Sequence, residues 1–172
     1  MQHTSRFKHS QYIGIDPDTS KSGVAVISTY TEKDPEGYAA SIRMSTMDFH
    51  TLIQFIRQND AGDMLVAIEK CWATTANWHL PKACTPNAAA KIGLNTGKCH
   101  MVGILLEEYC LKNEVNHALV EPLRKIWGPQ RNSKISHGEL MQVLRSMHIR
   151  YIGPNRTNQE ERDAALIALT RR

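Results

Sequence analysis

Residues 12–27, which read YIGIDPDTSKSGVAVI, are the stretch that decides the fold. An apolar run ends in Asp16, and a polar turn leads to Gly23 and a second apolar run. Two such runs joined by a short polar turn predict a β-hairpin. Asp is depleted in strands, so Asp16 at the end of the first strand has two open interpretations. It is either an ordinary Asp-Pro turn former or a ligand in a site.

The composition is that of an ordinary globular protein. The chain has 172 residues, of which 41% are hydrophobic and 22% are charged, so it can bury a core of its own. The formal net charge of +4 is compatible with a phosphate-rich partner but does not identify one. We predict one domain spanning residues 1–172, in which residues 1–11 form a short polar arm.

The cysteines and the N-terminus indicate a cytoplasmic protein, either in a bacterial cell or, for a viral protein, in its host cell. The four cysteines form no CxxC pair, which argues against a zinc site and favours reduced thiols. The N-terminus lacks the apolar core of a signal peptide. No apolar run reaches membrane-spanning length, so we expect no membrane contact.

Hydrophobic periodicity predicts an α/β chain. Strands are expected at residues 12–16, 24–30, 38–47, 64–68 and 117–120, with a last strand or extended piece at 149–152. Helices are expected at residues 48–58, 87–112, 133–147 and 158–170. This order predicts a mixed five-stranded sheet flanked by helices on both faces, which is the order of a ribonuclease H-like fold.

Acidic residues recur where buried segments end. Glu69 directly follows the apolar run at 64–68, which is typical of a strand buried on both faces. Glu160 and Asp163 are three residues apart on the last helix, so they share one helix face ahead of the apolar run AALIAL. An acid beside a buried stripe is costly unless it is paired or binds a cation.

Glu160 keeps a second interpretation as a helix cap. Both Thr157-x-x-Glu160 and Asn158-x-x-Glu161 fit the spacing of a capping box. If Glu160 instead joins the other acids, the cluster predicts a site for two divalent cations acting on a phosphodiester. Hard oxygen ligands favour Mg²⁺ or Mn²⁺ over zinc.

Five segments, in chain order, resemble the RuvC family of Holliday-junction resolvases: GIDPDTSKSG, VAIEK, KIGLNTGKCHMVGILLEE, SKISHGELMQVL and ERDAALIAL. The resemblance runs over residues 12–170. It implies a ribonuclease H-like homodimer that nicks four-way DNA junctions with two Mg²⁺ ions, for which Mn²⁺ can substitute. Asp16, Glu69 and Asp163 match the family's motif acids, and Glu160 falls where the family has an Asp or His.

The same resemblance implies further roles. Lys134 aligns with a family lysine near the scissile phosphate, which adds it to the four acids as a catalytic residue. Trp72 follows Glu69 where the family has an aromatic that wedges into the junction; the alternative is a core or dimer-contact tryptophan. Asp18 replaces the family's turn glycine, and either adds an acid near the metals or reshapes the turn. The expected DNA-binding residues are Trp72, Lys70, Lys82, Arg124, Lys125 and Arg131.

The sequence therefore predicts a metal-dependent endonuclease that resolves four-way junctions by paired nicks, without a small-molecule cofactor. Two symmetrical cuts require a homodimer, and we expect the Gly/Ala-rich helix from Asn87 to form the interface. The alternatives are a nuclease of the same fold acting on structured RNA, as in ribosomal-RNA maturation, and an inactive junction-binding protein. A nucleotide-binding protein of the actin and sugar-kinase type needs two such domains, whereas this chain holds one.

Overall fold

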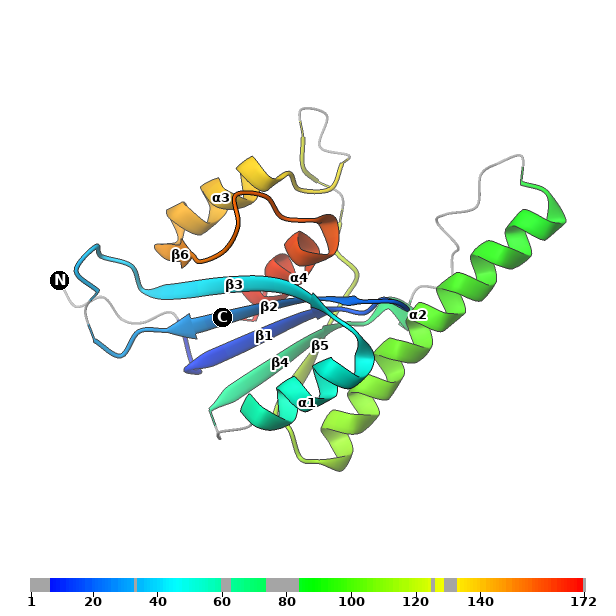
Figure 1. The fold of residues 1–172 in the computed structure, drawn as a ribbon, viewed down its shortest axis with the longest axis horizontal. Helices are drawn as coiled ribbons and strands as arrows, with labels where there is room; N and C mark the ends of the chain where they lie inside the picture. Colours follow the sequence, from blue (N-terminus) through cyan, green and yellow to red (C-terminus); the bar gives the residue numbers. More distant parts are fainter. Residues whose placement is uncertain are drawn as a thin grey trace.

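The computed structural model describes residues 7–32, 34–59, 63–73, 84–124, 126–128 and 133–171 (Figure 1). The strands are β1 (Gln11–Asp16), β2 (Ser22–Thr29), β3 (Ala40–Met47), β4 (Met64–Glu69), β5 (His117–Val120) and β6 (Ile149–Tyr151). The helices are α1 (Phe49–Asn59), α2 (Pro86–Lys112), α3 (His137–Ser146) and α4 (Gln159–Leu169), with a short 3₁₀ helix, η1 (Cys71–Ala73), after β4.

The strands form one mixed sheet in the order β5-β4-β1-β2-β3-β6 (Figure 1). β2 runs antiparallel to both of its neighbours, and the remaining pairs are parallel. The prediction of a mixed α/β sheet is confirmed, but the expected number of five strands is wrong. The sixth strand, β6, pairs with β3 through only three residues. A segment that short has no clear period, which is why the sequence left 149–152 open between strand and extended piece.

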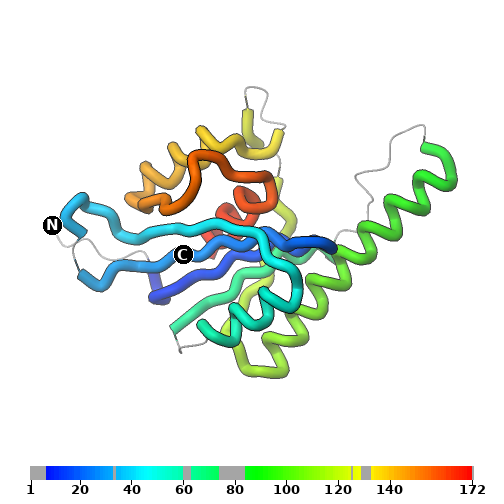
Figure 2. The backbone as a smooth tube through the Cα atoms, viewed as in Figure 1, coloured from blue at the N-terminus to red at the C-terminus, as the bar shows by residue number. Residues whose placement is uncertain are grey.

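Helices cover both faces of the sheet, as Figure 2 also shows in the path of the backbone. Alternate residues of β1 point to opposite faces, so Ile13 and Ile15 pack with α1 and α2, whereas Tyr12 packs with α3 and α4. On the first face the buried helical residues include Leu52, Ile56, Leu106 and Cys110. On the second face they include Leu140, Leu144, Ala164 and Ala168.

Helix α4 lies directly against the backbone of β1 and β2. A Cβ at Gly14 would lie 2.1 Å from the carbonyl oxygen of Ala164 and 2.5 Å from the nitrogen of Ala168. A Cβ at Gly23 would lie 2.1 Å from the carbonyl oxygen of Glu160. The two glycines sit on neighbouring strands, and their missing side chains leave the room that the helix backbone occupies. This approach fixes which residues of α4 face the strand ends.

The start of α3 differs from the prediction. Ser136 and Glu139 form a capping box, in which the Ser136 N–H donates to the Glu139 carboxylate at 2.8 Å. The helix therefore begins at His137, four residues after the predicted start, because Ser133 pairs with Trp127 in an isolated β-bridge. The other predicted elements begin and end within two residues of the observed ones. None of the described helices is long and apolar enough to span a membrane.

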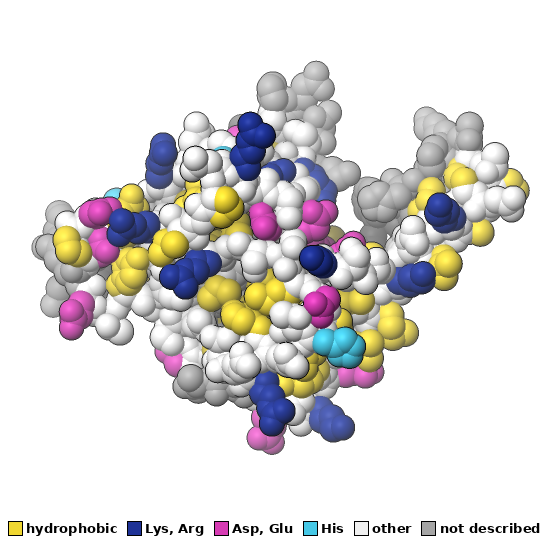
Figure 3. Space-filling model, viewed as in Figure 1, with side chains coloured by type: hydrophobic (Ala, Val, Ile, Leu, Met, Phe, Trp, Pro, Cys, Tyr) yellow, Lys and Arg dark blue, Asp and Glu magenta, His cyan; other side chains and the backbone are white. Residues whose placement is uncertain are grey.

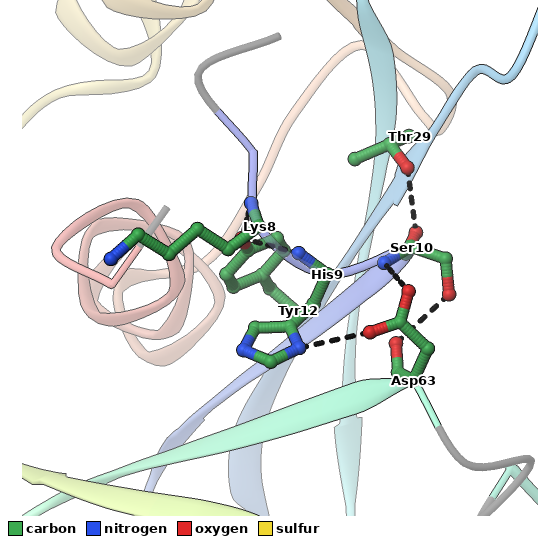
Figure 4. A network of polar contacts seen from close by, with 6 residues as sticks. All are labelled: Lys8, His9, Ser10, Tyr12, Thr29 and Asp63. Atoms are coloured by element: carbon green, nitrogen blue, oxygen red, sulfur yellow. Dashed lines mark hydrogen bonds and ion pairs between the residues drawn. The ribbon is translucent and has the colours of Figure 1, made fainter.

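The described part of the predicted N-terminal arm is held at the start of β1 (Figure 4). The Tyr12 hydroxyl accepts hydrogen bonds from the backbone N–H groups of Lys8 and His9, at 2.6 and 2.9 Å. The Asp63 carboxylate accepts from the Ser10 N–H at 2.8 Å and lies 3.0 Å from His9 Nδ1. These contacts secure the end of β1 that is remote from Asp16.

We predict that Gly14→Ala lowers the free energy of unfolding by about 1–3 kcal/mol, because the new methyl group meets helix backbone rather than a flexible side chain. Gly93→Ala is the control, since apart from its own stretch of helix no described atom lies within 4 Å of its Cβ position on α2. That variant should gain up to about 1 kcal/mol from helix propensity. Urea denaturation measures both. Equal stability of Gly14→Ala and the natural protein would contradict the close approach of α4.

Candidate active site

The ends of β1 and β4 bring two acids to one face of the sheet. Side chains alternate along each strand, so Asp16 lies on the same face as Gly14, which α4 covers. By the same rule, Glu69 lies on the face of Leu65, which packs in the apolar layer beneath α3 and α4. The parallel register of β1 and β4 places the two acids beside each other at the strand exits.

Helix α4 brings the other two acids to the same place. Asp163 is only 8% exposed and lines a cavity of about 90 Å³ together with Asp16 and Glu69. Glu160, one turn earlier on α4, contacts Gly23, which is the pairing partner of Asp16 in the hairpin. The structure therefore brings the four predicted acids to one end of the sheet, with Glu160 beside the cavity rather than in its lining.

The capping alternative for Glu160 is settled by the start of α4. Asn158 Oδ1 accepts from the Glu161 N–H at 2.8 Å, and Glu161 Oε2 accepts from the Asn158 N–H at 2.9 Å. The capping box therefore uses Asn158 and Glu161, not Thr157 and Glu160. Glu160 is left half-buried on the side of the helix that faces the sheet.

A lysine and two N–H donors hold the buried acids. Lys134 Nζ lies 2.6 Å from Asp163 Oδ2, and Gln159 Nε2 donates to Asp163 Oδ1 at 2.8 Å. The backbone N–H of Leu123 donates to Glu69 Oε1 at 3.0 Å. The i, i+4 spacing of Gln159 and Asp163 is a sequence signal that we did not use. No sequence signal marks the Leu123 contact, because it depends on the path of the chain after β5.

Two of the acids, Asp16 and Glu69, have raised pKa values. Burial raises the pKa of Asp16 to about 8, reinforced by the negative charges of Glu69 and Asp163 and opposed by Lys134. Burial also raises the pKa of Glu69, although the Leu123 N–H partly offsets it. Burial by itself lowers the pKa of Lys134, but the hydrogen bond and charge of Asp163 outweigh it and raise that pKa overall. The side chains thus interact as one electrostatic unit.

Among the residues that the structure describes, no three or more Asp, Glu, His or Cys side chains are arranged as a ready-made metal site. The negative charge of these acids is offset by the N–H donors of Lys134, Gln159 and Leu123. The donor chemistry nevertheless fits a divalent cation, because carboxylates on two strand ends and one helix face repel one another when ionised. The residues that would hold Mg²⁺ or Mn²⁺ are Asp16, Glu69, Glu160 and Asp163.

Trp72 packs against α2. A Cβ at Gly103 would lie 2.5 Å from the Trp72 ring, and the ring contributes to the apolar layer between the sheet, α1 and α2. This geometry supports the alternative of a packing tryptophan. The ring remains partly exposed, so a contact with an unpaired base stays a prediction.

The other expected DNA-binding residues fall into two groups. Arg124 lines the same cavity as the acids, together with Trp127, which we had not assigned to the site. Lys70 directly follows β4, and its backbone N–H bonds to the carbonyl oxygen of Val120 at 2.7 Å. Lys82, Lys125 and Arg131 lie outside the described residues.

Asp18 shapes the turn of the β1–β2 hairpin. Its Oδ1 accepts from the backbone N–H and the hydroxyl of Ser20, at 2.9 and 3.0 Å. Its own N–H donates to Ser22 Oγ at 3.2 Å. Its second oxygen faces α2, 3.9 Å from Cys99 Sγ. Of the two alternatives for Asp18, the contacts support the reshaped turn.

Comparison with solved structures shows a shared fold. Thermus thermophilus RuvC in complex with Holliday junction substrate aligns over 93% of this chain and 91% of its own, with a TM-score of 0.51 and 12% identity. A second Thermus thermophilus RuvC structure, 15% identical, aligns over 93% and 92% with a TM-score of 0.48. No protein-family model matches the sequence, and no curated protein matches it significantly. The chain therefore shares the fold of Thermus thermophilus RuvC.

We predict that Asp16 makes the metal-free protein less stable as the pH rises. The pKa of Asp16 is about 8 in the folded protein against an ordinary value of 3.8, so between these values the folded state binds more protons than the unfolded chain. Its contribution to the free energy of unfolding falls across this window and levels off above about pH 8. Asp16→Asn removes this contribution.

The measurement is urea denaturation in EDTA from pH 4 to pH 9. The stability of Asp16→Asn relative to the natural protein should increase as the pH rises. Asp34→Asn, in the β2–β3 turn, should show no such trend, because Asp34 follows the end of β2 that is remote from Asp16. A constant difference between Asp16→Asn and the natural protein would show that Asp16 is not buried among like charges.

Proposed function

We propose that this chain is a divalent-metal-dependent endonuclease that resolves four-way DNA junctions by paired, symmetrical nicks. The observation that carries the proposal is the convergence of Asp16, Glu69 and Asp163 in one cavity beside Lys134. The fold supports the substrate class, because the similar Thermus thermophilus RuvC is in complex with a Holliday junction substrate.

The four acids and Lys134 divide the chemistry. Asp16, Glu69, Glu160 and Asp163 hold two Mg²⁺ ions, for which Mn²⁺ substitutes. When bound, such ions supply charge stabilisation and an activated water for phosphodiester hydrolysis. Lys134, whose side chain is half-exposed at the cavity, neutralises the negative charge of the scissile phosphate.

Basic side chains around the cavity bind the DNA backbone. Arg124 lines the cavity and Lys70 directly follows the strand that ends in Glu69, which supports a proposed contact of both with phosphates near the cut. Each such contact releases counterions and makes binding dependent on salt. The sequence adds Lys82, Lys125 and Arg131 to the proposed DNA-binding residues, and the partly exposed ring of Trp72 is proposed to stack on a base at the junction.

The active unit is a homodimer formed through α2. In the described helix only Gly103, Leu106 and Cys110 are buried, so its first half projects from the sheet (Figure 1). Leu94 and Met101 are 60% and 53% exposed, and Figure 3 shows hydrophobic and basic side chains along this projecting part. Positions 94, 101 and 105 share one helix face, which a second copy of the chain covers.

A cleavage assay tests the proposed activity. The natural protein should nick a labelled four-way DNA junction in Mg²⁺ and leave it intact in EDTA. Asp16→Asn should lower the rate by more than the roughly 10–100-fold typical of losing an outer-shell partner of a metal. Asp34→Asn is the matched control and should cleave normally, because its side chain caps a remote turn.

Substrate comparison separates the alternatives. An RNA hairpin and a linear DNA duplex should be cut far more slowly than the junction. Preferential cleavage of the RNA hairpin would favour the RNA nuclease instead. Binding of the junction without any Mg²⁺-dependent cleavage would favour an inactive junction-binding protein. Equal cleavage by the natural protein and Asp16→Asn would show that the acid cluster does not carry the activity.

The dimer interface has its own test. Introducing charge with Leu94→Asp and Met101→Asp together should shift the dimer to monomer in analytical ultracentrifugation, because both side chains lie on the proposed interface. Leu111→Asp is the control, since Leu111 is 62% exposed on another face of the same helix. Dimers that persist in the double variant at micromolar concentration would exclude this face as the interface.

A further inference from the structure

The Asp163–Lys134 ion pair occupies the place where the proposed function needs a metal. Asp163 is the most buried of the described acids, and both of its oxygens accept hydrogen bonds, one from Lys134 and one from Gln159. Each oxygen keeps a second lone pair for a cation, but an ammonium group in contact with Asp163 repels a divalent ion that binds there. The Lys134 contact, at 2.6 Å, must therefore lengthen or break when a metal binds.

Lys134 is also the cation that the proposed function assigns to the scissile phosphate. Its side chain is 49% exposed and extends from the segment before α3, whereas the Asp163 side chain is only 12% exposed on α4. The lysine can therefore turn outward, while the aspartate is held by Gln159 and the packed helix. The ammonium group has three donors, but a phosphate bound beside the Asp163 carboxylate would be repelled by its negative charge.

We infer that Lys134 is a built-in counter-cation of the acid cluster, which a divalent ion displaces and so releases toward the substrate phosphate. The inference rests on the proposed function and extends it. In the free protein the ammonium offsets the repulsion among Asp16, Glu69 and Asp163. Metal binding takes over that task, and the same lysine becomes available for DNA. Because the metal must displace Lys134 first, the lysine contacts the phosphate only when the acids hold a metal.

This exchange gives Lys134 two effects of opposite sign. Its charge competes with a divalent ion for the acids, so removing it should tighten metal binding. Its contact with the phosphate assists cleavage, so removing it should slow the reaction even when the metal site is saturated. A purely structural role would weaken metal binding and cleavage together, because the cavity would lose its shape.

The test is calorimetric titration of Mn²⁺ into the natural protein and three variants. Lys134→Met should bind Mn²⁺ about fivefold more tightly, which is the upper end expected for loss of a half-exposed competing charge. At saturating Mn²⁺ it should nevertheless cut the junction at least about tenfold more slowly, as loss of a charge-assisted contact predicts. Lys134→Arg keeps a cation and should bind Mn²⁺ as the natural protein does.

Lys112→Met is the matched control. It removes the same charge from the exposed last turn of α2, which the cavity does not include, and should change neither property. Thermal melting without metal shows whether Lys134→Met is folded. That variant should melt at a lower temperature than Lys112→Met, since its acids have lost their counter-cation, and Mn²⁺ should restore most of the difference.

Acetylation followed by mass spectrometry reports the release directly. Mg²⁺ should increase acetylation of Lys134 and leave that of Lys112 unchanged, because only Lys134 leaves a carboxylate. Equal Mn²⁺ affinity of Lys134→Met and the natural protein, or Mg²⁺-independent acetylation of Lys134, would overturn the exchange while leaving the nuclease proposal intact. Failure of both proteins to bind Mn²⁺ would overturn the exchange and the metal-dependent function together.

Discussion

The close packing of α4 on the backbone of β1 and β2 is the constraint on which the site depends. At Gly14 and Gly23 there is no side chain between helix and sheet, so the helix backbone rests on the strands. Asp163 lies on α4 between these two points of contact, and it faces the exits of β1 and β4. A larger residue at either glycine would lift the helix and separate the acids that the fold brings together.

That packing creates an electrostatic cost at the strand ends. Burial, reinforced by the negative charges of Glu69 and Asp163, raises the pKa of Asp16 to about 8. The cluster therefore opposes folding unless cations or donors balance it. Lys134 and the N–H groups of Gln159 and Leu123 provide that balance in the free protein. Apolar residues at these positions would avoid this cost. A functional requirement therefore explains the acids better than a requirement for stability does.

Much of this arrangement was predictable because it depends on short-range periodicity. Alternation along β1 and β4 fixes the face of Asp16 and Glu69, and the 3.6-residue period of α4 fixes the face of Asp163. The number of strands was not predictable, because β6 is three residues long and pairs only through tertiary contacts. Likewise, the sequence gives no sign that Trp72 finds its place against Gly103 of α2, 31 positions further along the chain.

The Lys134–Asp163 pair shows where sequence reasoning stops. The sequence marks both residues through the resemblance to RuvC, but it assigns them to separate partners, a phosphate and a metal. Their direct contact follows from the extended segment before α3, which the predicted helix start at 133 had replaced. A four-residue difference in a helix boundary therefore decides how the site is balanced before any ligand arrives.

The most direct measurement is an anomalous difference map from crystals of the protein soaked in Mn²⁺, collected at the manganese absorption edge. The account predicts strong peaks between the carboxylates of Asp16, Glu69 and Asp163, with the Lys134 ammonium moved away from Asp163. Peaks only elsewhere, or an acid cluster still bound to Lys134 in crystals of protein that cleaves junctions in Mn²⁺, would contradict it.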